Sequence, residues 1–102
     1  MDHVQPDYLA QKEIMTVIRK KILPEYFEAV TSGKKKFELR LNEFDIKEGD
    51  TLLLEEWDAD KMEYTGRKIE RKVTYVRDFK IDKLWWPVKD IMEKGLLVIS
   101  ME

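Results

Sequence analysis

Residues 24–41 have the sequence PEYFEAVTSGKKKFELRL, in which a helical pattern is followed by an alternating one. Pro24 suits the first position of a helix, and Phe27 and Val30 are three residues apart, so they lie on one helix face. Gly33 suits the left-handed position that follows a helix end. From that glycine onward, apolar and charged residues alternate. The stretch therefore predicts a short helix followed directly by a half-buried strand over 34–41.

Further strand patterns lie on both sides of this stretch. A polar run over 58–61 separates two of them, which predicts a long antiparallel hairpin. The remaining strands are indicated by β-branched residues or by short apolar runs. Together with 34–41, the predicted strands cover 13–22, 51–57, 62–77 and 96–101.

A second helix is predicted near the C-terminus. Pro87 suits its start and Gly95 its cap, with Val88, Ile91 and Met92 on its apolar face. The resulting order is β-α-β-β-β-α-β. This order predicts an α+β fold, namely a small, mostly antiparallel β-barrel of about five strands with two short helices.

The length of the chain predicts one domain. Its 102 residues include 43% hydrophobic and 11% aromatic residues, enough for one core. We find no internal repeat, low-complexity tract or linker, so the predicted domain covers 1–102. Residues 1–11 show no clear period and are expected to form a loosely attached N-terminal segment.

The composition excludes several kinds of site. The chain has no cysteine and a single histidine, His3, which argues against disulfides, a metal centre and a Ser-His-Asp triad. We predict no metal and no cofactor.

The first ten residues lack the features of a signal peptide, and no apolar run approaches the ~20 residues that span a bilayer. We therefore expect a cytoplasmic protein without a membrane partner. A monomer is assumed, and the abundance of Glu, Lys and Arg is typical of heat-adapted chains.

The charges are unevenly distributed along a chain whose net charge is −2. Basic residues outnumber acidic ones by eight to four over 12–40 and by six to two over 64–80. Between them, over 41–63, acidic residues outnumber basic ones by nine to two. If the basic segments meet in space, they form a local anion-binding face. The alternative is that they are solvated strand faces.

The strongest candidate for chemistry is the segment from Gly33 to Arg40. Alternation would place Glu38 and Arg40 on one face, where they can pair or together bind a polar ligand. Lys35 supplies a mobile cation, or an amine of lowered pKa if it is desolvated among other cations. The alternative is a charged surface with weak ion pairs, each worth ~0–1 kcal/mol.

These residues also match a known family. The pattern Gly-x-Lys-x-x-Glu-x-Arg, formed by Gly33, Lys35, Glu38 and Arg40, resembles the signature of ASCH domains, which share the PUA-like fold. Flanking residues over 24–30, 49–50, 64–67 and 73–75 are similar to a short prokaryotic ASCH-like family. The resemblance covers roughly 18–76, with 96–99 as a closing strand.

The resemblance implies a role related to RNA. Some small ASCH proteins of similar length are amidohydrolases that act on acylated cytidine. They use the motif lysine, which falls on Lys35, and a hydroxyl residue three positions later, where this chain has Glu38. They also use a distant glutamate, for which the candidates here are Glu55, Glu56 and Asp78.

The leading hypothesis is therefore a module that binds RNA or a nucleotide-like ligand. Cations would contact phosphate, and Trp85 and Trp86 would either stack on bases or belong to the core. One alternative is a hydrolase on a modified nucleoside such as acylated cytidine, with Lys35 and Glu38 as catalytic residues. Another is a protein-interaction domain that uses the acidic hairpin. The predicted ligand-binding residues are Lys34, Lys35, Lys36, Glu38, Arg40, Arg71, Trp85 and Trp86.

Overall fold

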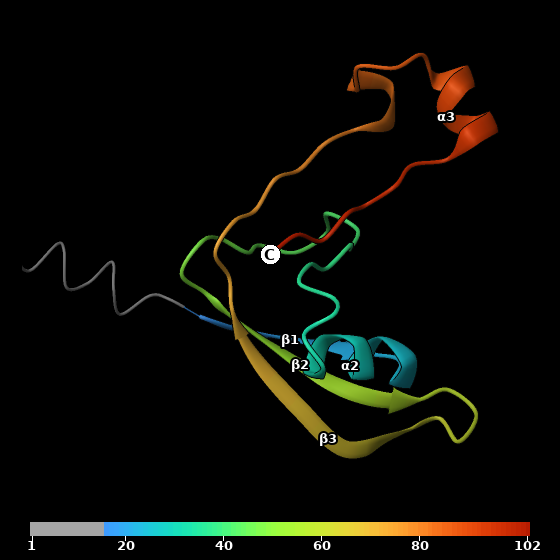
Figure 1. Ribbon diagram of the computed structural model, residues 1–102. Coiled ribbons are helices and arrows are strands. Elements are labelled where there is room, and N and C mark those ends of the chain that lie inside the picture. Colours follow the sequence, from blue (N-terminus) through green and yellow to red (C-terminus); the bar gives the residue numbers. More distant parts are fainter. Residues whose placement is uncertain (1–15) are drawn as a thin grey trace, which may run out of the picture.

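The computed structural model describes residues 16–102 and contains one three-stranded sheet (Figure 1). Its strands are β1 (Val17–Ile22), β2 (Thr51–Asp58) and β3 (Glu63–Lys72), in the order β1-β2-β3. β1 is parallel to β2, and β2 is antiparallel to β3. Since parallel neighbours need a crossover connection, α2 (Pro24–Thr31) follows β1 and crosses the sheet before β2 begins.

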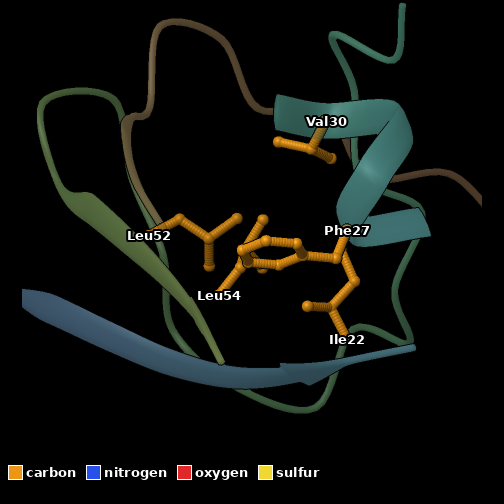
Figure 2. Packing of buried hydrophobic residues seen from close by; sticks show 5 residues of the cluster. All are labelled: Ile22, Phe27, Val30, Leu52 and Leu54. Carbon is orange, nitrogen blue, oxygen red and sulfur yellow. The ribbon is translucent and has the colours of Figure 1, made fainter. Parts of the chain in front are cut away.

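The core lies between α2 and one face of the sheet. Figure 2 shows the side chains of Phe27 and Val30 pointing from α2 toward Leu52 and Leu54 of β2, with Ile22 at the end of β1. Alternate residues of β2 are buried in this layer, so the other residues of β2 face away from α2. Four partly buried residues extend the core, namely Ile18, Ile46, Ile69 and Val73.

The first predicted helix is confirmed, with both of its end signals. Pro24 occupies its first turn, and Glu25 lies beside the positive end of the helix. The last turn closes as the backbone amide of Ser32 donates to the oxygen of Glu28 at 3.0 Å. Gly33 then has φ +83°, a left-handed conformation that side chains with a Cβ atom rarely adopt.

We expect Gly33→Ala to lower the free energy of unfolding by about 1 kcal/mol. No atom lies within 4 Å of the Cβ that alanine would add, so the cost is one of backbone conformation and not of collision. Urea unfolding followed by circular dichroism measures it. Gly33→Asn is the matched control, because asparagine tolerates this conformation better. Equal losses in the two variants would contradict the explanation.

The predicted hairpin is also confirmed, as β2 and β3. The carboxylate oxygen Oδ1 of Asp58 accepts hydrogen bonds from the backbone amides of Asp60 and Lys61, which stabilises the turn. The pairing register shifts by a bulge between Glu55 and Trp57. β3 ends at Lys72 and is therefore shorter than the strand predicted over 62–77.

The predicted five-stranded barrel is wrong. Within residues 16–102 the sheet has three strands and does not close, and its first two strands are parallel. Neither 34–41 nor 96–101 is a strand, and Leu39 and Leu41 are 66% and 76% exposed. Alternation produces a strand only where a neighbouring backbone supplies hydrogen bonds. Here the amide of Lys35 donates back to Ala29 of the helix at 2.8 Å.

The C-terminal part contains η1 (Ile81–Lys83) and α3 (Val88–Lys94), and Figure 1 shows both lying apart from the sheet. The second predicted helix is thus confirmed, and Gly95 follows it with φ +75°. Only its Ile91 is buried; Val88 and Met92 are exposed, so the predicted apolar face is mostly uncovered. The alternative that placed Trp85 and Trp86 in the core is wrong, since they are 92% and 55% exposed.

Two predictions fall on other parts of the chain. The segment 1–11, expected to be loosely attached, lies outside the described residues, as do the first three residues of the strand predicted over 13–22. Among residues 16–102, no helix combines the length and apolar character that crossing a bilayer requires.

Candidate functional site

The motif residues Lys35, Glu38 and Arg40 form one connected cluster in the segment after α2. The ammonium of Lys35 donates to the backbone oxygen of Phe37 at 2.8 Å and to Oε1 of Glu38. Arg40 donates from Nε to the other oxygen of the same carboxylate, Oε2, at 2.8 Å. Glu38 therefore bridges the two cations, and all three side chains are partly buried.

Arg40 also ties this segment to the sheet. Its Nη2 atom donates to the backbone oxygen of Lys21 in β1 at 2.9 Å and forms an ion pair with Oε2 of Glu38 at 2.7 Å. The guanidinium is thus held from two sides. Charge-assisted hydrogen bonds of this kind fix the orientation of an arginine.

An open cleft of about 690 Å³ lies beside Arg40 and the edge strand β1. It brings together four cations and one carboxylate, together with one phenol ring. The cations come from β1 and from the motif, the carboxylate from β2 and the ring from β3. The lining residues are Arg19, Lys20, Lys21, Arg40, Glu55 and Tyr64.

The carboxylate of this cleft is already paired. Glu55 accepts hydrogen bonds from Nε and Nη2 of Arg19 at 3.3 and 3.1 Å, and these bonds hold the pKa of Glu55 below its usual value. The same interaction raises the pKa of Arg19. Because Glu55 is neutralised by Arg19, the remaining cations give the cleft an excess of positive charge.

Aromatic rings lie next to these cations. The rings of Trp57 and Tyr64 meet edge to face, with centroids 4.9 Å apart. The ammonium of Lys21 lies 3.7 Å from the Trp57 centroid and 5.7 Å from that of Tyr64. The ammonium of Lys20 lies 3.6 Å from the Phe44 centroid. A cation above an aromatic ring is held by the electrostatic field of the ring, which orients both groups.

The structure separates the other predicted site residues from this cleft. Lys34 and Lys36 line a second, smaller hollow of about 240 Å³ beside the C-terminal segment. Arg71 lies under α2, with Nη2 3.5 Å from the backbone oxygen of Val30. Trp85 and Trp86 follow η1 in the chain and precede α3, which Figure 1 shows apart from the sheet. Of the eight predicted ligand-binding residues, only Arg40 lines the cleft, with Lys35 and Glu38 positioning it.

Sequence reasoning missed the contribution of β1 and β3. Arg19, Lys20 and Lys21 form an unbroken basic run inside a strand that is otherwise apolar, and this run was a usable signal. Tyr64 carried no such signal. Its position in the cleft depends on its pairing with Trp57 across the hairpin, which brings it near Lys21.

A second ionic cluster lies on the opposite, α2-covered side of the sheet. Glu56 is 3% exposed and accepts hydrogen bonds from Nε and Nη2 of Arg67, at 2.9 and 2.7 Å, and from the hydroxyl of Thr65 at 2.6 Å. The bonds from Arg67, and then that from Thr65, lower the pKa of Glu56. Arg67 also binds Glu28 of α2 and lies 4.7 Å from the Phe27 ring centroid. This cluster fastens the hairpin to the helix.

The three candidates for a distant catalytic carboxylate are now distinguished by position. Glu55 lines the cleft, Glu56 belongs to the cluster under α2, and Asp78 lies beyond the end of β3. In the part of the chain that the structure describes, no group of three or more acidic or histidine side chains has the arrangement of a metal site.

The cleft lies in a part of the chain that is similar to other proteins. The chain is similar to the "Uncharacterized 12.9 kDa protein in GpA 3'region" of Escherichia phage P2, with 41% identity over 58 residues. The aligned part is 57% of this chain and 51% of the relative, so the match covers about half of that protein. Residues 19–88, which include every residue that lines the cleft, match the family described as "Domain of unknown function (DUF3850)", and the chain therefore belongs to this family.

Proposed function

We propose that this domain binds RNA or a nucleotide-like ligand in the cleft beside β1. The observation that carries the proposal is an open cleft lined by an aromatic ring and by four cations, of which Arg19 is paired with Glu55. Phosphate groups are recognised by arginine and lysine, and bases stack on aromatic side chains. The resemblance of Gly33, Lys35, Glu38 and Arg40 to the ASCH motif agrees with this role.

Arg40 is the expected phosphate contact. Glu38 and the backbone oxygen of Lys21 hold its Nε and Nη2 atoms, so the side chain loses little freedom when a ligand arrives. Its Nη1 atom makes no hydrogen bond within residues 16–102 and remains available to an anion. Lys20 and Lys21 add positive charge from the neighbouring strand, and Tyr64 offers a ring to a base.

The geometry favours binding over hydrolysis of a modified nucleoside. A catalytic lysine must reach the reacting group. The ammonium of Lys35 instead donates to the oxygen of Phe37 and to Glu38, and Lys35 is not among the residues that line the cleft. Its contacts suit a positioning role, in which it holds Glu38 and, through Glu38, Arg40.

We expect Arg40→Ala to weaken binding of a short single-stranded RNA at least about tenfold, because a charged hydrogen bond contributes about 1.5–3 kcal/mol. Lys21→Ala should also weaken it. Fluorescence anisotropy with a labelled RNA at several salt concentrations measures both effects. Contact of Arg40, Lys20 and Lys21 with phosphate predicts a slope of about −2 when log affinity is plotted against log salt.

Lys34→Ala is the matched control, since it removes a cation from the second hollow and leaves the cleft intact. Equal losses for Lys34→Ala and Arg40→Ala would show that only general charge matters, which contradicts a cleft-specific site. Incubation with acylated cytidine tests the alternative in parallel. Product formation that disappears in Lys35→Ala would establish a hydrolase and overturn the binding role.

A further inference from the structure

β3 is an edge strand whose outer side has no partner among residues 16–102 (Figure 1). Both backbone groups of Val73, just beyond β3, bond toward the β2 side: its amide donates to Asp50 and its oxygen accepts from Gly49, each at 2.8 Å. Backbone groups alternate in direction along an antiparallel strand. Those of Lys68, Glu70 and Lys72 therefore point outward, where a further strand can pair.

The charges on this edge select a particular partner. We propose that β3 pairs with β3 of a second copy of this chain, antiparallel and centred on Ile69. In this register Lys68 of each copy lies opposite Glu70 of the other, so two opposite-charge pairs form. The two Ile69 side chains face each other on the side that α2 covers, where Ile69 already packs against the core.

Each neighbouring symmetric register opposes two like charges at its centre. Centring on Lys68 sets that lysine against itself, and centring on Glu70 sets two glutamates against each other. Centring on Arg71 opposes two arginines, although it also sets Glu70 of each copy against Lys72 of the other. Like charges directly across a strand pair are destabilising, so the central pair favours Ile69, which carries no charge and packs against the core.

The residues that would pair are available for it. Lys68 and Glu70 are exposed and take part in no ion pair within the described part of the chain. Charged edges commonly prevent association, but they do so when the same charges meet. The register also brings Arg67 opposite Arg71 of the second copy. Arg67 is already neutralised by Glu56 and Glu28, which limits this repulsion.

The pairing would join two sheets into one of six strands. The two-fold axis of such a pair runs perpendicular to the sheet, so both copies present the same face to the same side. The two clefts would therefore open on one surface. A dimer would therefore offer two clefts to one ligand. The pairing is inferred from β3 alone and does not depend on the proposed binding function.

Charge reversal tests the pairing, with sedimentation equilibrium of the full chain over a range of concentrations as the measurement. We expect wild type to dimerise, and Lys68→Glu and Glu70→Lys each to weaken the dimer at least about tenfold, because each creates two like-charge pairs. The double variant Lys68→Glu, Glu70→Lys restores both opposite-charge pairs and should recover the dimer. Lys89→Glu on α3 is the control for a general change in charge, and circular dichroism confirms that each variant is folded.

Amide hydrogen exchange provides a second readout that does not require mutation. The amides of Lys68 and Glu70 should become protected as the protein concentration rises, whereas they should exchange rapidly in the monomer. A protein that remains monomeric at all concentrations would overturn the proposal. So would a dimer that the single variants leave unchanged or that the double variant fails to restore.

Discussion

Replacing Phe27 with alanine is expected to lower the free energy of unfolding by about 3–5 kcal/mol. Its side chain is 4% exposed and lies in the centre of the small core formed by Ile22, Val30, Leu52 and Leu54 (Figure 2). Few other buried side chains are present in the described part of the chain to fill the space left behind. Because a domain of this size has a total stability of about 5–15 kcal/mol, the loss is a large part of it. Urea unfolding followed by circular dichroism measures the change.

Leu39→Ala is the matched control for this prediction. Leu39 is apolar like Phe27, but it lies in the irregular segment after α2 and is mostly exposed. Its truncation should change the stability by only about 0.5 kcal/mol. In a closed barrel with 34–41 as a half-buried strand, the same substitution would cost about 2–5 kcal/mol. Similar losses in the two variants would therefore contradict the open sheet.

Acid is expected to destabilise the fold as the pH falls below about 4, through two buried carboxylates, Asp50 and Glu56. Backbone amides of Thr16 and Lys47 donate to Asp50 and lower its pKa, and Arg67 and Thr65 do the same for Glu56. A carboxylate whose pKa is lower in the folded state stabilises the fold above its unfolded pKa. This contribution is lost as the pH falls through the folded pKa.

Glu56→Gln separates this contribution from general acid effects. The difference in stability between wild type and Glu56→Gln should be largest near neutral pH. It should begin to shrink below about pH 4, where the unfolded chain takes up the proton, and vanish as the pH falls through the lowered pKa of folded Glu56. Thermal unfolding across a pH series gives this difference. Glu43→Gln, at an exposed side chain, is the control and should follow the wild-type curve. A difference for Glu56→Gln that stays constant with pH would contradict the assignment.

The sequence predicted that Glu38 and Arg40 can pair, and they do, although the reason given for it does not hold. The prediction relied on alternation along a strand, and the segment is not a strand. The pair forms nevertheless, because two oppositely charged side chains two residues apart lie within reach in many extended conformations. Lys35 joins them through the same carboxylate. The ASCH resemblance and the binding role remain predictions.

The sequence by itself determined the features that depend on neighbouring residues. Pro24 and Gly33 delimit the first helix, the polar run over 58–61 marks the hairpin, and Pro87 and Gly95 bound the last helix. Each of these signals acts through backbone conformation or through a hydrogen bond to a residue close by in the chain. Such local preferences are present before any distant segment packs.

Only the tertiary structure decided which distant segments meet. The parallel pairing of β1 with β2 brings Lys21 beside Glu55, and the bond from Arg40 to Lys21 completes the cleft. The same long-range pairing decides that 34–41 and 96–101 stay outside the sheet, although their alternation is that of strands. Alternation specifies which side chains share a face, but it does not determine which other strand supplies the backbone hydrogen bonds. For this reason the helices and the hairpin were predictable, whereas the sheet order and the membership of the cleft were not.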